Sequence, residues 1–240
     1  MNLPSQISPN PLINSMIEIR FESSLSQEEV LPTLFPIFSK DFPKLKERRI
    51  PIAIKEQDID LRYAANYVFS NEKYSIFIDS NVIGFENANN DYQLWTNYFP
   101  IIKENVNTLM NLNIISKIER IGVRYSSLFE NINSFSDILK IDIQFPYPDY
   151  AKSDYVFKTQ LKKDNIILLL QLVQNATVKQ NDKSRTGILI DIDASISDDI
   201  ENSTNEQIFH LIDQLHYEEK KLFFSLINES FLATLNPQYK

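Results

Sequence analysis

Residues 114–125, with the sequence IISKIERIGVRY, are central to the fold because they alternate as a β-strand does. In a strand, successive side chains point to opposite faces. One face is predicted to carry Glu119, Ile121, Val123 and Tyr125, and the other Ile118, Arg120, Gly122 and Arg124. This strand falls near the middle of the chain, so we expect elements from both halves to pair with it.

Toward the amino terminus, residues 11–22 also alternate and predict a first strand. Ser26 and Glu29 have the spacing of a capping box, which predicts a helix that Pro36 bends or ends. Residues 39–58 have a mixed composition with prolines, so we expect a loop there.

Three short strands are expected next, and polar turn residues between them predict a meander. They are Leu61–Phe69, Tyr74–Asp79 and Val82–Glu86. From Asp91 the spacing of apolar residues predicts a helix, and Pro100 makes two helical pieces an alternative to one.

The second half of the chain repeats the order of a meander followed by a helix. The predicted strands are Tyr155–Leu161, Ile166–Val178 and Gly187–Ser195. Ser203 and Glu206 form another capping-box pattern, which opens an amphipathic helix that is expected to run to about Leu235.

These patterns predict an α+β protein with an antiparallel sheet, built from two meander-plus-helix halves whose long helices pack on the sheet. The halves are residues 1–130 and 154–240, joined by a proline-interrupted segment at 131–153. One continuous domain is the alternative, since 240 residues fit either arrangement.

Composition excludes several classes of function. Cysteine is absent, which excludes disulfides, thiolate metal sites and cysteine nucleophiles. A net charge of -8 without a basic stripe argues against nucleic-acid binding. The chain lacks an apolar run long enough for a membrane helix, and its start lacks the pattern of a secretory signal. We therefore expect a cytoplasmic protein without a membrane partner.

Asp191 and Asp193 are the candidate metal ligands. Residues two apart on a strand share a face, and paired carboxylates can bind Mg²⁺ through oxygen. The alternative is a solvent-facing side of an amphipathic strand, or pairing with lysines of a neighbouring strand. The three glycines are isolated, so no loop that cradles phosphate accompanies the pair.

Arg120 and Arg124 are the candidate ligand-binding residues, with Gly122 between them on the same predicted face. Two guanidinium groups beside a residue without a side chain can hold a flat anion or a carboxylate by bidentate hydrogen bonds. The structural alternative, which we favour, is ion pairing with Glu18 or Glu22 of the first strand.

Other catalytic chemistry finds little support in the sequence. His210 and His216 are its only histidines, and six residues apart they lie on different sides of a helix, so shared metal ligation is not expected. A Gly-x-Ser-x-Gly turn that would position a nucleophilic serine is also missing.

Four segments together carry a resemblance. They are PLINSMIEIRF at 11–21, ERIGVRY at 119–125, GILIDIDA at 187–194 followed by the helix LIDQLHYEEKKLFFSLI at 211–227, and YQLW at 92–95. The chain resembles a sporadically distributed family of uncharacterised bacterial proteins, which often carries an acid where this chain has Asn14. The resemblance implies an architecture but no catalytic residues, and a patchy distribution like that of defence or toxin–antitoxin genes.

Without a catalytic motif, we expect a non-enzymatic protein without a cofactor that binds another protein, encoded nearby in a bacterial defence or toxin–antitoxin-like gene pair. The alternative is a Mg²⁺-dependent enzyme or sensor for a phosphorylated small molecule or nucleotide. In that alternative Asp191 and Asp193 hold the metal, and Arg120 or Arg124 holds the anion. A third possibility is a ligand cavity between the sheet and a helix.

Overall fold

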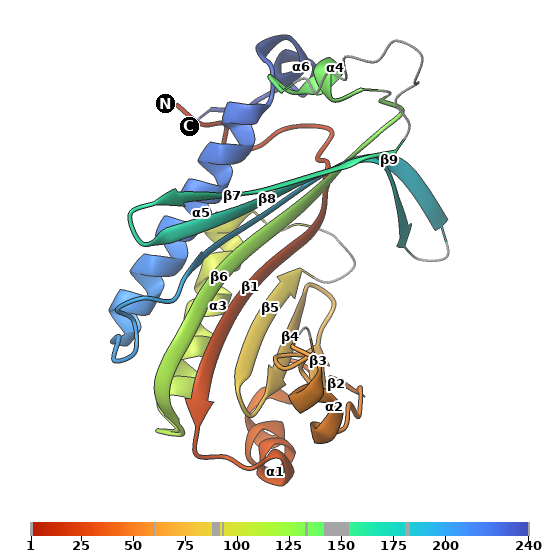
Figure 1. The fold of residues 1–240 in the computed structure, drawn as a ribbon. Helices are drawn as coiled ribbons and strands as arrows, with labels where there is room; N and C mark the ends of the chain where they lie inside the picture. The colour runs from red at the N-terminus through yellow and green to blue at the C-terminus, as the bar shows by residue number, and fades with distance from the viewer. Residues whose placement is uncertain are drawn as a thin grey trace. The chain divides into compact units, whose positions relative to one another are not determined.

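The computed structural model describes residues 2–59, 61–87, 92, 94–132, 134–141, 154–180 and 183–239 (Figure 1). The chain forms two compact units. Unit 1 consists of Met1–Ile13, Arg124–Ala194 and His216–Lys240, and unit 2 consists of Asn14–Val123 and Ser195–Leu215. Residues 142–153 of the predicted connecting segment lie outside the described residues, and the division into two sequential halves stays a prediction.

Nine strands and six helices occur within the described residues. The strands are β1 (Leu12–Ser23), β2 (Lys44–Glu47), β3 (Tyr67–Ser70), β4 (Tyr74–Asp79), β5 (Val82–Asn87), β6 (Ile115–Glu130), β7 (Val156–Lys163), β8 (Ile166–Gln180) and β9 (Lys183–Ile196). The helices are α1 (Gln27–Phe38), α2 (Ile52–Gln57), α3 (Trp95–Met110), α4 (Phe135–Ile138), α5 (Asn205–Leu226) and α6 (Glu229–Thr234).

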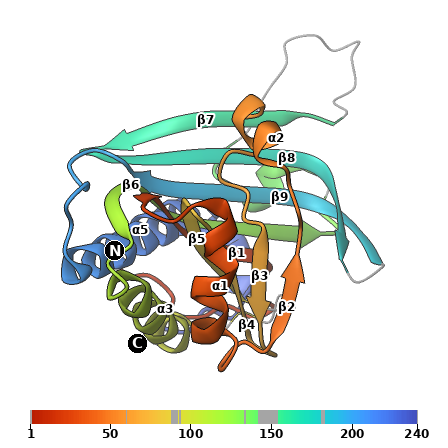
Figure 2. The same ribbon diagram turned by 90° about the horizontal axis from the view of Figure 1, so that it is seen from below.

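The described strands form a sheet in the order β2-β3-β4-β5-β1-β6-β9-β8-β7. The sheet is antiparallel, helices pack on it, and α5 contacts β6 and β9. One meander, β3 to β5, comes before the long helix α3, and a second, β7 to β9, comes before the long helix α5. Figure 2 shows β7, β8 and β9 running side by side. The predicted α+β class is therefore confirmed.

The core of unit 2 follows from the alternation of β1. Ile17, Ile19 and Phe21 are at most 2% exposed, whereas the residues between them are partly exposed. Helix α3 adds a buried stripe at helical spacing, which consists of Tyr98, Ile102, Val106 and Leu109. Each fully buried large apolar side chain contributes about 1.5–3 kcal/mol, so this packing stabilises the sheet of the unit.

Proline does not end either helix of unit 2 in which it occurs. Helix α1 continues past Pro36 to Phe38, and α3 runs through Pro100 as one helix that begins at Trp95 rather than Asp91. A proline within a helix removes one backbone donor. The buried residues on both sides of Pro100 hold α3 together, so two helical pieces are not observed.

The loop predicted at residues 39–58 is wrong in part, because β2 and α2 lie within it. Strand β2 has the sequence KLKE and pairs with β3, so its mostly exposed polar side chains show no apolar alternation. Helix α2 is only six residues long and follows Pro51. In contrast, the strand predicted to begin at Leu61 begins at Tyr67.

Unit 1 contains a close approach between β6 and β9. A Cβ atom added to Gly187 would lie 2.2 Å from the carbonyl oxygen of Phe129, so only glycine fits there without a shift of the backbone. The ring of Phe129 also stacks on Phe223 of α5, with 6.4 Å between the ring centroids. These contacts join the helix to the strand within this unit.

The predicted boundaries of the last helix need two corrections. Its capping residues are Thr204 and Gln207, one position later than the predicted Ser203 and Glu206, and the Thr204 backbone N–H donates to Gln207 Oε1 at 2.8 Å. The helix also does not run on to Leu235. It ends at Leu226, and Asn228 Oδ1 accepts from the Phe231 N–H at 2.7 Å to begin α6.

Candidate functional site

Asp191 of unit 1 is buried and accepts hydrogen bonds from two side chains of β6. Arg124 donates from Nε to Oδ1 and from Nη2 to Oδ2, both at 2.9 Å, and Ser126 Oγ donates to Oδ1 at 2.6 Å. The Arg124 side chain is 54% exposed, whereas that of Asp191 is 9% exposed. A bidentate pair of this kind fixes the guanidinium in one plane, so Arg124 holds a carboxylate of its own chain.

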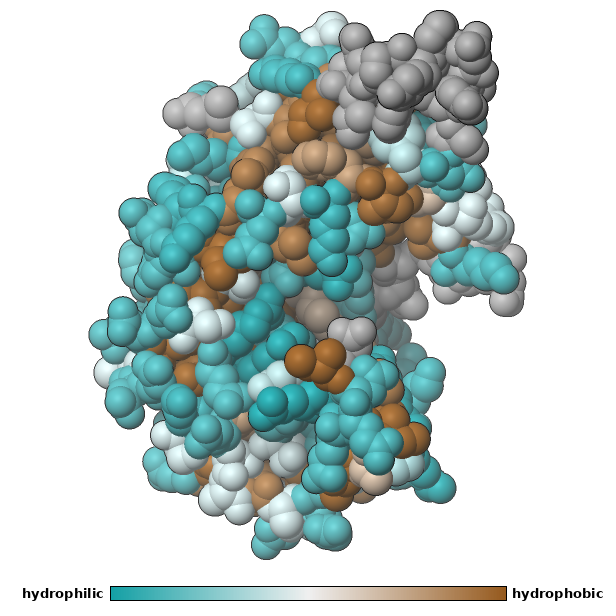
Figure 3. Space-filling view, viewed as in Figure 1, coloured by the Kyte–Doolittle hydropathy of each residue, from teal (hydrophilic) through white to brown (hydrophobic). Residues whose placement is uncertain are grey.

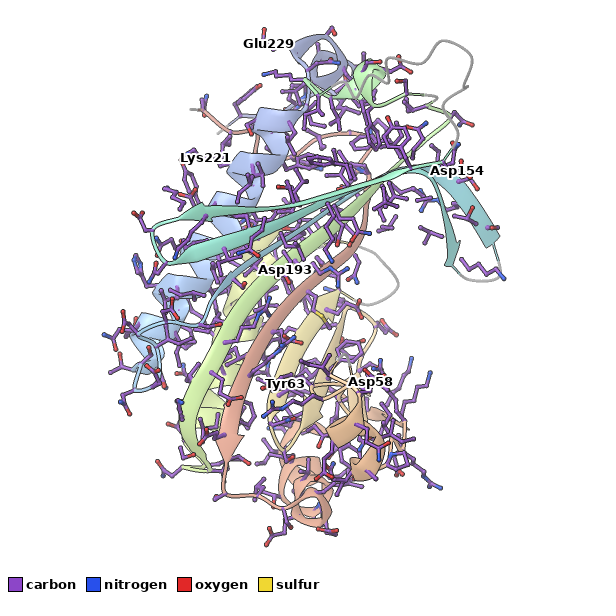
Figure 4. The ribbon with its side chains drawn as sticks, viewed as in Figure 1. Asp58, Tyr63, Asp154, Asp193, Lys221 and Glu229 are labelled. Atoms are coloured by element: carbon purple, nitrogen blue, oxygen red, sulfur yellow. The ribbon has the colours of Figure 1, made fainter. Side chains whose placement is uncertain are left out.

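Asp193 lies two residues farther along β9 and is half-buried (Figure 4). Both oxygens of Asp191 already accept protein donors, which Mg²⁺ would have to replace. Within the described part of the chain, acidic residues and histidines do not form a group of three or more that could hold a metal ion. The metal-binding role of Asp191 and Asp193 stays a prediction.

Arg120 of unit 2 pairs with Glu18 of β1, as the structural interpretation predicts. Glu18 Oε1 accepts from Arg120 Nη1 at 3.0 Å and from Arg20 Nε at 2.6 Å. A Cβ atom at Gly122 would lie 2.3 Å from Arg120 Nη1, so the Arg120 side chain lies over the glycine. Gly122 therefore leaves room for an ion pair within the chain, and a ligand-binding role of Arg120 stays a prediction.

Tyr63, which the sequence does not single out, joins the same polar network in unit 2 (Figure 4). Its hydroxyl donates to Glu119 Oε2 at 3.0 Å, and the Arg20 guanidinium carbon lies 4.3 Å from its ring centroid. Partial burial, and next the hydrogen bond to Glu119, raises the pKa of Tyr63. Glu119 thus makes a polar contact, whereas Ile121, which is predicted to share its face, is fully buried.

Burial along β6 departs from strict alternation. Ile118 and Ile121 are both buried, at 1% and 0% exposed, although they are three residues apart. Two half-buried residues separate these positions, and the three residues Ile121, Gly122 and Val123 are then all buried. Glu119 and Arg120 are the two half-buried residues.

A second polar cluster of unit 2 is centred on Asp79, whose side chain is fully buried. Its Oδ2 accepts from Lys55 Nζ at 2.7 Å and from the Asn66 N–H at 2.8 Å. Its Oδ1 accepts from Gln27 Nε2 at 2.5 Å and from the Ser80 N–H at 2.8 Å. The side chain of Lys55 is itself only 8% exposed, so the two residues form a buried ion pair.

Three of the four groups that bind Asp79 also line a pocket of about 330 Å³. The lining residues, all in unit 2, are Gln27, Ile52, Lys55, Glu56, Arg62, Ser80 and Asn81. The pocket lining thus combines one apolar side chain with amide, hydroxyl and charged groups. Such a combination can bind a small polar group and orient it.

Arg62 supplies a second positive charge to this pocket. The guanidinium is exposed, lies 5.4 Å from the ring centroid of Tyr63, and makes no ion pair with any described carboxylate. The backbone of Arg62 is fixed by a hydrogen bond, because Asn81 Nδ2 donates to the Arg62 carbonyl at 3.2 Å. Glu56, also exposed, places one carboxylate at the same pocket.

Unit 1 contains two buried titratable groups on α5. Burial, and next the nearby Lys220, lowers the pKa of His216 to about 3, and the ring lies 5.5 Å from that of Tyr125. Burial also raises the pKa of Glu219 well above its ordinary value, and the charge of Asp191 adds to this rise. His216 is therefore a neutral packed side chain at pH 7, whereas His210 is exposed.

Helix α2 and the residue two positions after it expose a local group of apolar side chains in unit 2. Ile52, Ile54 and Ile59 are 47%, 46% and 83% exposed, and they are three of the eight exposed large apolar residues in the described part of the chain. Figure 3 shows hydrophobic surface over α2, at the lower right of the view. We call these three residues the isoleucine patch.

Comparisons with known proteins do not assign the chain to a family. A scan against protein-family models finds no model that matches the chain, and a search of curated proteins finds no significant match. The resemblance carried by the four segments therefore stays a prediction. Among the described helices, none has the length and apolar composition to cross a membrane.

Proposed function

We propose that this chain is a non-enzymatic component that binds another protein, as the partner in a bacterial defence or toxin–antitoxin-like gene pair. Three of the four residues predicted to carry chemistry form ion pairs within the chain: Arg124 with Asp191, and Arg120 with Glu18. These side chains stabilise their strands, which is the role expected of a binding scaffold.

The observation that carries the proposal is the isoleucine patch. Three large apolar side chains gathered within eight residues are unusual on a surface, where single exposed apolar residues are the norm. A partner that covered them would remove apolar area from water, at about 25 cal/mol for each Å². We expect each isoleucine to contribute about 1–2 kcal/mol, because roughly half or more of its side chain is still exposed.

The surroundings of the patch indicate an acidic partner surface. The residues that lead into α2 include four exposed basic side chains, Lys44, Lys46, Arg48 and Arg49. Glu47 is the only acid among residues 44–49, so this segment has a net charge of +3, although the whole chain has -8. Opposite charges on two surfaces accelerate association and select the partner.

The test is capture of the partner from the native genomic context by the tagged chain. A double variant, I54S/I59S, removes most of the patch without touching the pocket. Val156, which is 61% exposed on β7, provides the matched control V156S. The proposal predicts a stoichiometric partner, at least about tenfold weaker binding by the double variant, since 1.4 kcal/mol is tenfold, and unchanged binding by V156S. Equal binding by all forms, or no partner, would contradict it.

A further inference from the structure

The pocket of unit 2 adjoins the isoleucine patch, because Ile52 belongs to both. Ile52 is 47% exposed and lines the pocket together with Lys55 of the same short helix. A partner segment that covers Ile52 therefore contacts the lining of the pocket. A side chain of that segment can enter the pocket.

Lys55 lines the pocket, and its buried ammonium group has hydrogen-bonding capacity beyond its bond to Asp79. An ammonium has three N–H donors, and Lys55 Nζ uses one of them on Asp79, its one acceptor among the described residues. The Lys55 side chain is 8% exposed, so any further acceptor for its ammonium group must come from within the pocket. Buried donors that lack an acceptor are costly, and a ligand oxygen at this position would relieve that cost.

The four charged groups at the pocket sum to zero, so it is the position of the Arg62 guanidinium, and not a net positive charge, that favours one carboxylate over a more highly charged ligand. Lys55 and Arg62 contribute two positive charges to the lining, and Glu56 contributes one negative charge. Asp79 beneath the lining compensates Lys55 further. The guanidinium of Arg62 is the group left to pair, and it suits a planar carboxylate by a bidentate contact. A doubly charged phosphate would be repelled more strongly by Glu56 and Asp79.

We infer that the pocket binds the carboxylate of an acidic side chain on the partner segment that covers the isoleucine patch. The inference rests on the proposed function and names the chemistry of the partner. Arg62 pairs with the carboxylate, Lys55 Nζ donates to it, and Ile52 packs against the neighbouring apolar residue of the segment.

The test uses the full chain, labelled with ¹⁵N, and two blocked peptides, acetyl-Leu-Glu-Leu amide and acetyl-Leu-Gln-Leu amide. We expect saturable shifts of the Ser80 and Asn81 signals with the glutamate peptide below about 10 mM, and at least tenfold weaker binding of the glutamine peptide. The R62Q variant should remove this preference, and R49Q, at an exposed arginine outside the pocket lining, should keep it. Equal binding of the two peptides, no binding, or an unchanged preference in R62Q would overturn the inference.

Two further results separate this inference from the proposed function. If I54S/I59S loses the captured partner but R62Q binds it as well as the native chain does, the carboxylate site is wrong and the binding function stands. If free acetate binds as tightly as the glutamate peptide, the pocket recognises a small carboxylate and not a partner side chain, which also overturns the inference.

Discussion

The buried ion pair between Lys55 and Asp79 predicts that removing Asp79 destabilises the protein more than removing Lys55 does. Replacing Asp79 by alanine removes the acceptor of four hydrogen bonds, two of them from backbone N–H groups. It also leaves the Lys55 ammonium buried without its carboxylate. Replacing Lys55 by methionine leaves Asp79 with three donors and fills nearly the same space.

The expected magnitudes follow from these contacts. Loss of one partner of a buried ion pair costs about 3–5 kcal/mol, so D79A should lower the free energy of unfolding by at least about 3 kcal/mol. The K55M variant also breaks the pair, but three donors still satisfy the Asp79 carboxylate, so we expect a smaller cost of about 1.5–3 kcal/mol. The exposed pair of Arg49 and Glu47, with side chains 84% and 36% exposed, provides the control E47A at about 0.5 kcal/mol or less.

Urea unfolding followed by circular dichroism measures all three differences. D79N, which keeps the size of the side chain and one acceptor oxygen, serves if D79A does not fold. The expected order of cost is D79A or D79N first, K55M second and E47A last. A K55M variant that costs as much as the Asp79 variants, or an E47A variant that matches them, would refute the assignment of Asp79 as the centre of this cluster.

Two further predictions concern unit 1. Because the pKa of His216 is lowered from 6.5 to about 3, the unfolded chain takes up this proton first as pH falls. Stability should drop by about 1.4 kcal/mol per pH unit within that window. H216N should lack this loss of stability at falling pH. The raised pKa of Glu219 has the opposite effect on stability, and it acts equally in the native chain and in H216N. G187A should lower the free energy of unfolding by about 2 kcal/mol or more, because its Cβ atom would meet the Phe129 carbonyl. The control G84A, at a glycine of unit 2 whose added Cβ would have no contact closer than 3.5 Å, should cost under about 1 kcal/mol. Thermal unfolding of the two variants measures the difference.

The parts of the fold that sequence patterns predict are those with a strong apolar period. Alternation places β1, and apolar runs between polar turns place β4, β5 and β7 to β9, with ends that differ by a few residues. In contrast, β2 has one apolar residue in four, so its strand geometry comes from pairing with β3. The apolar pattern of a short segment cannot predict a strand that forms only because it pairs with a distant segment.

The candidate site shows the same limit more strongly. The Arg120 pair with Glu18 was among the alternatives because both residues lie on predicted strands. Lys55 and Asp79, however, are 24 residues apart, and Tyr63 and Glu119 are 56 apart. Lys55 lies in a segment predicted as a loop, and Tyr63 lies in a predicted strand that begins only at Tyr67. Only the fold brings them together. The exposure of the three isoleucines is equally invisible in sequence, where they resemble core residues.

The most direct measurement of the binding function is hydrogen–deuterium exchange of the chain alone and in complex with its captured partner. We predict slower exchange in α2, residues Ile52–Gln57, and in the loop that follows it, because the partner covers the isoleucine patch. Unchanged exchange in this segment, with protection confined to other strands or helices, would contradict the account.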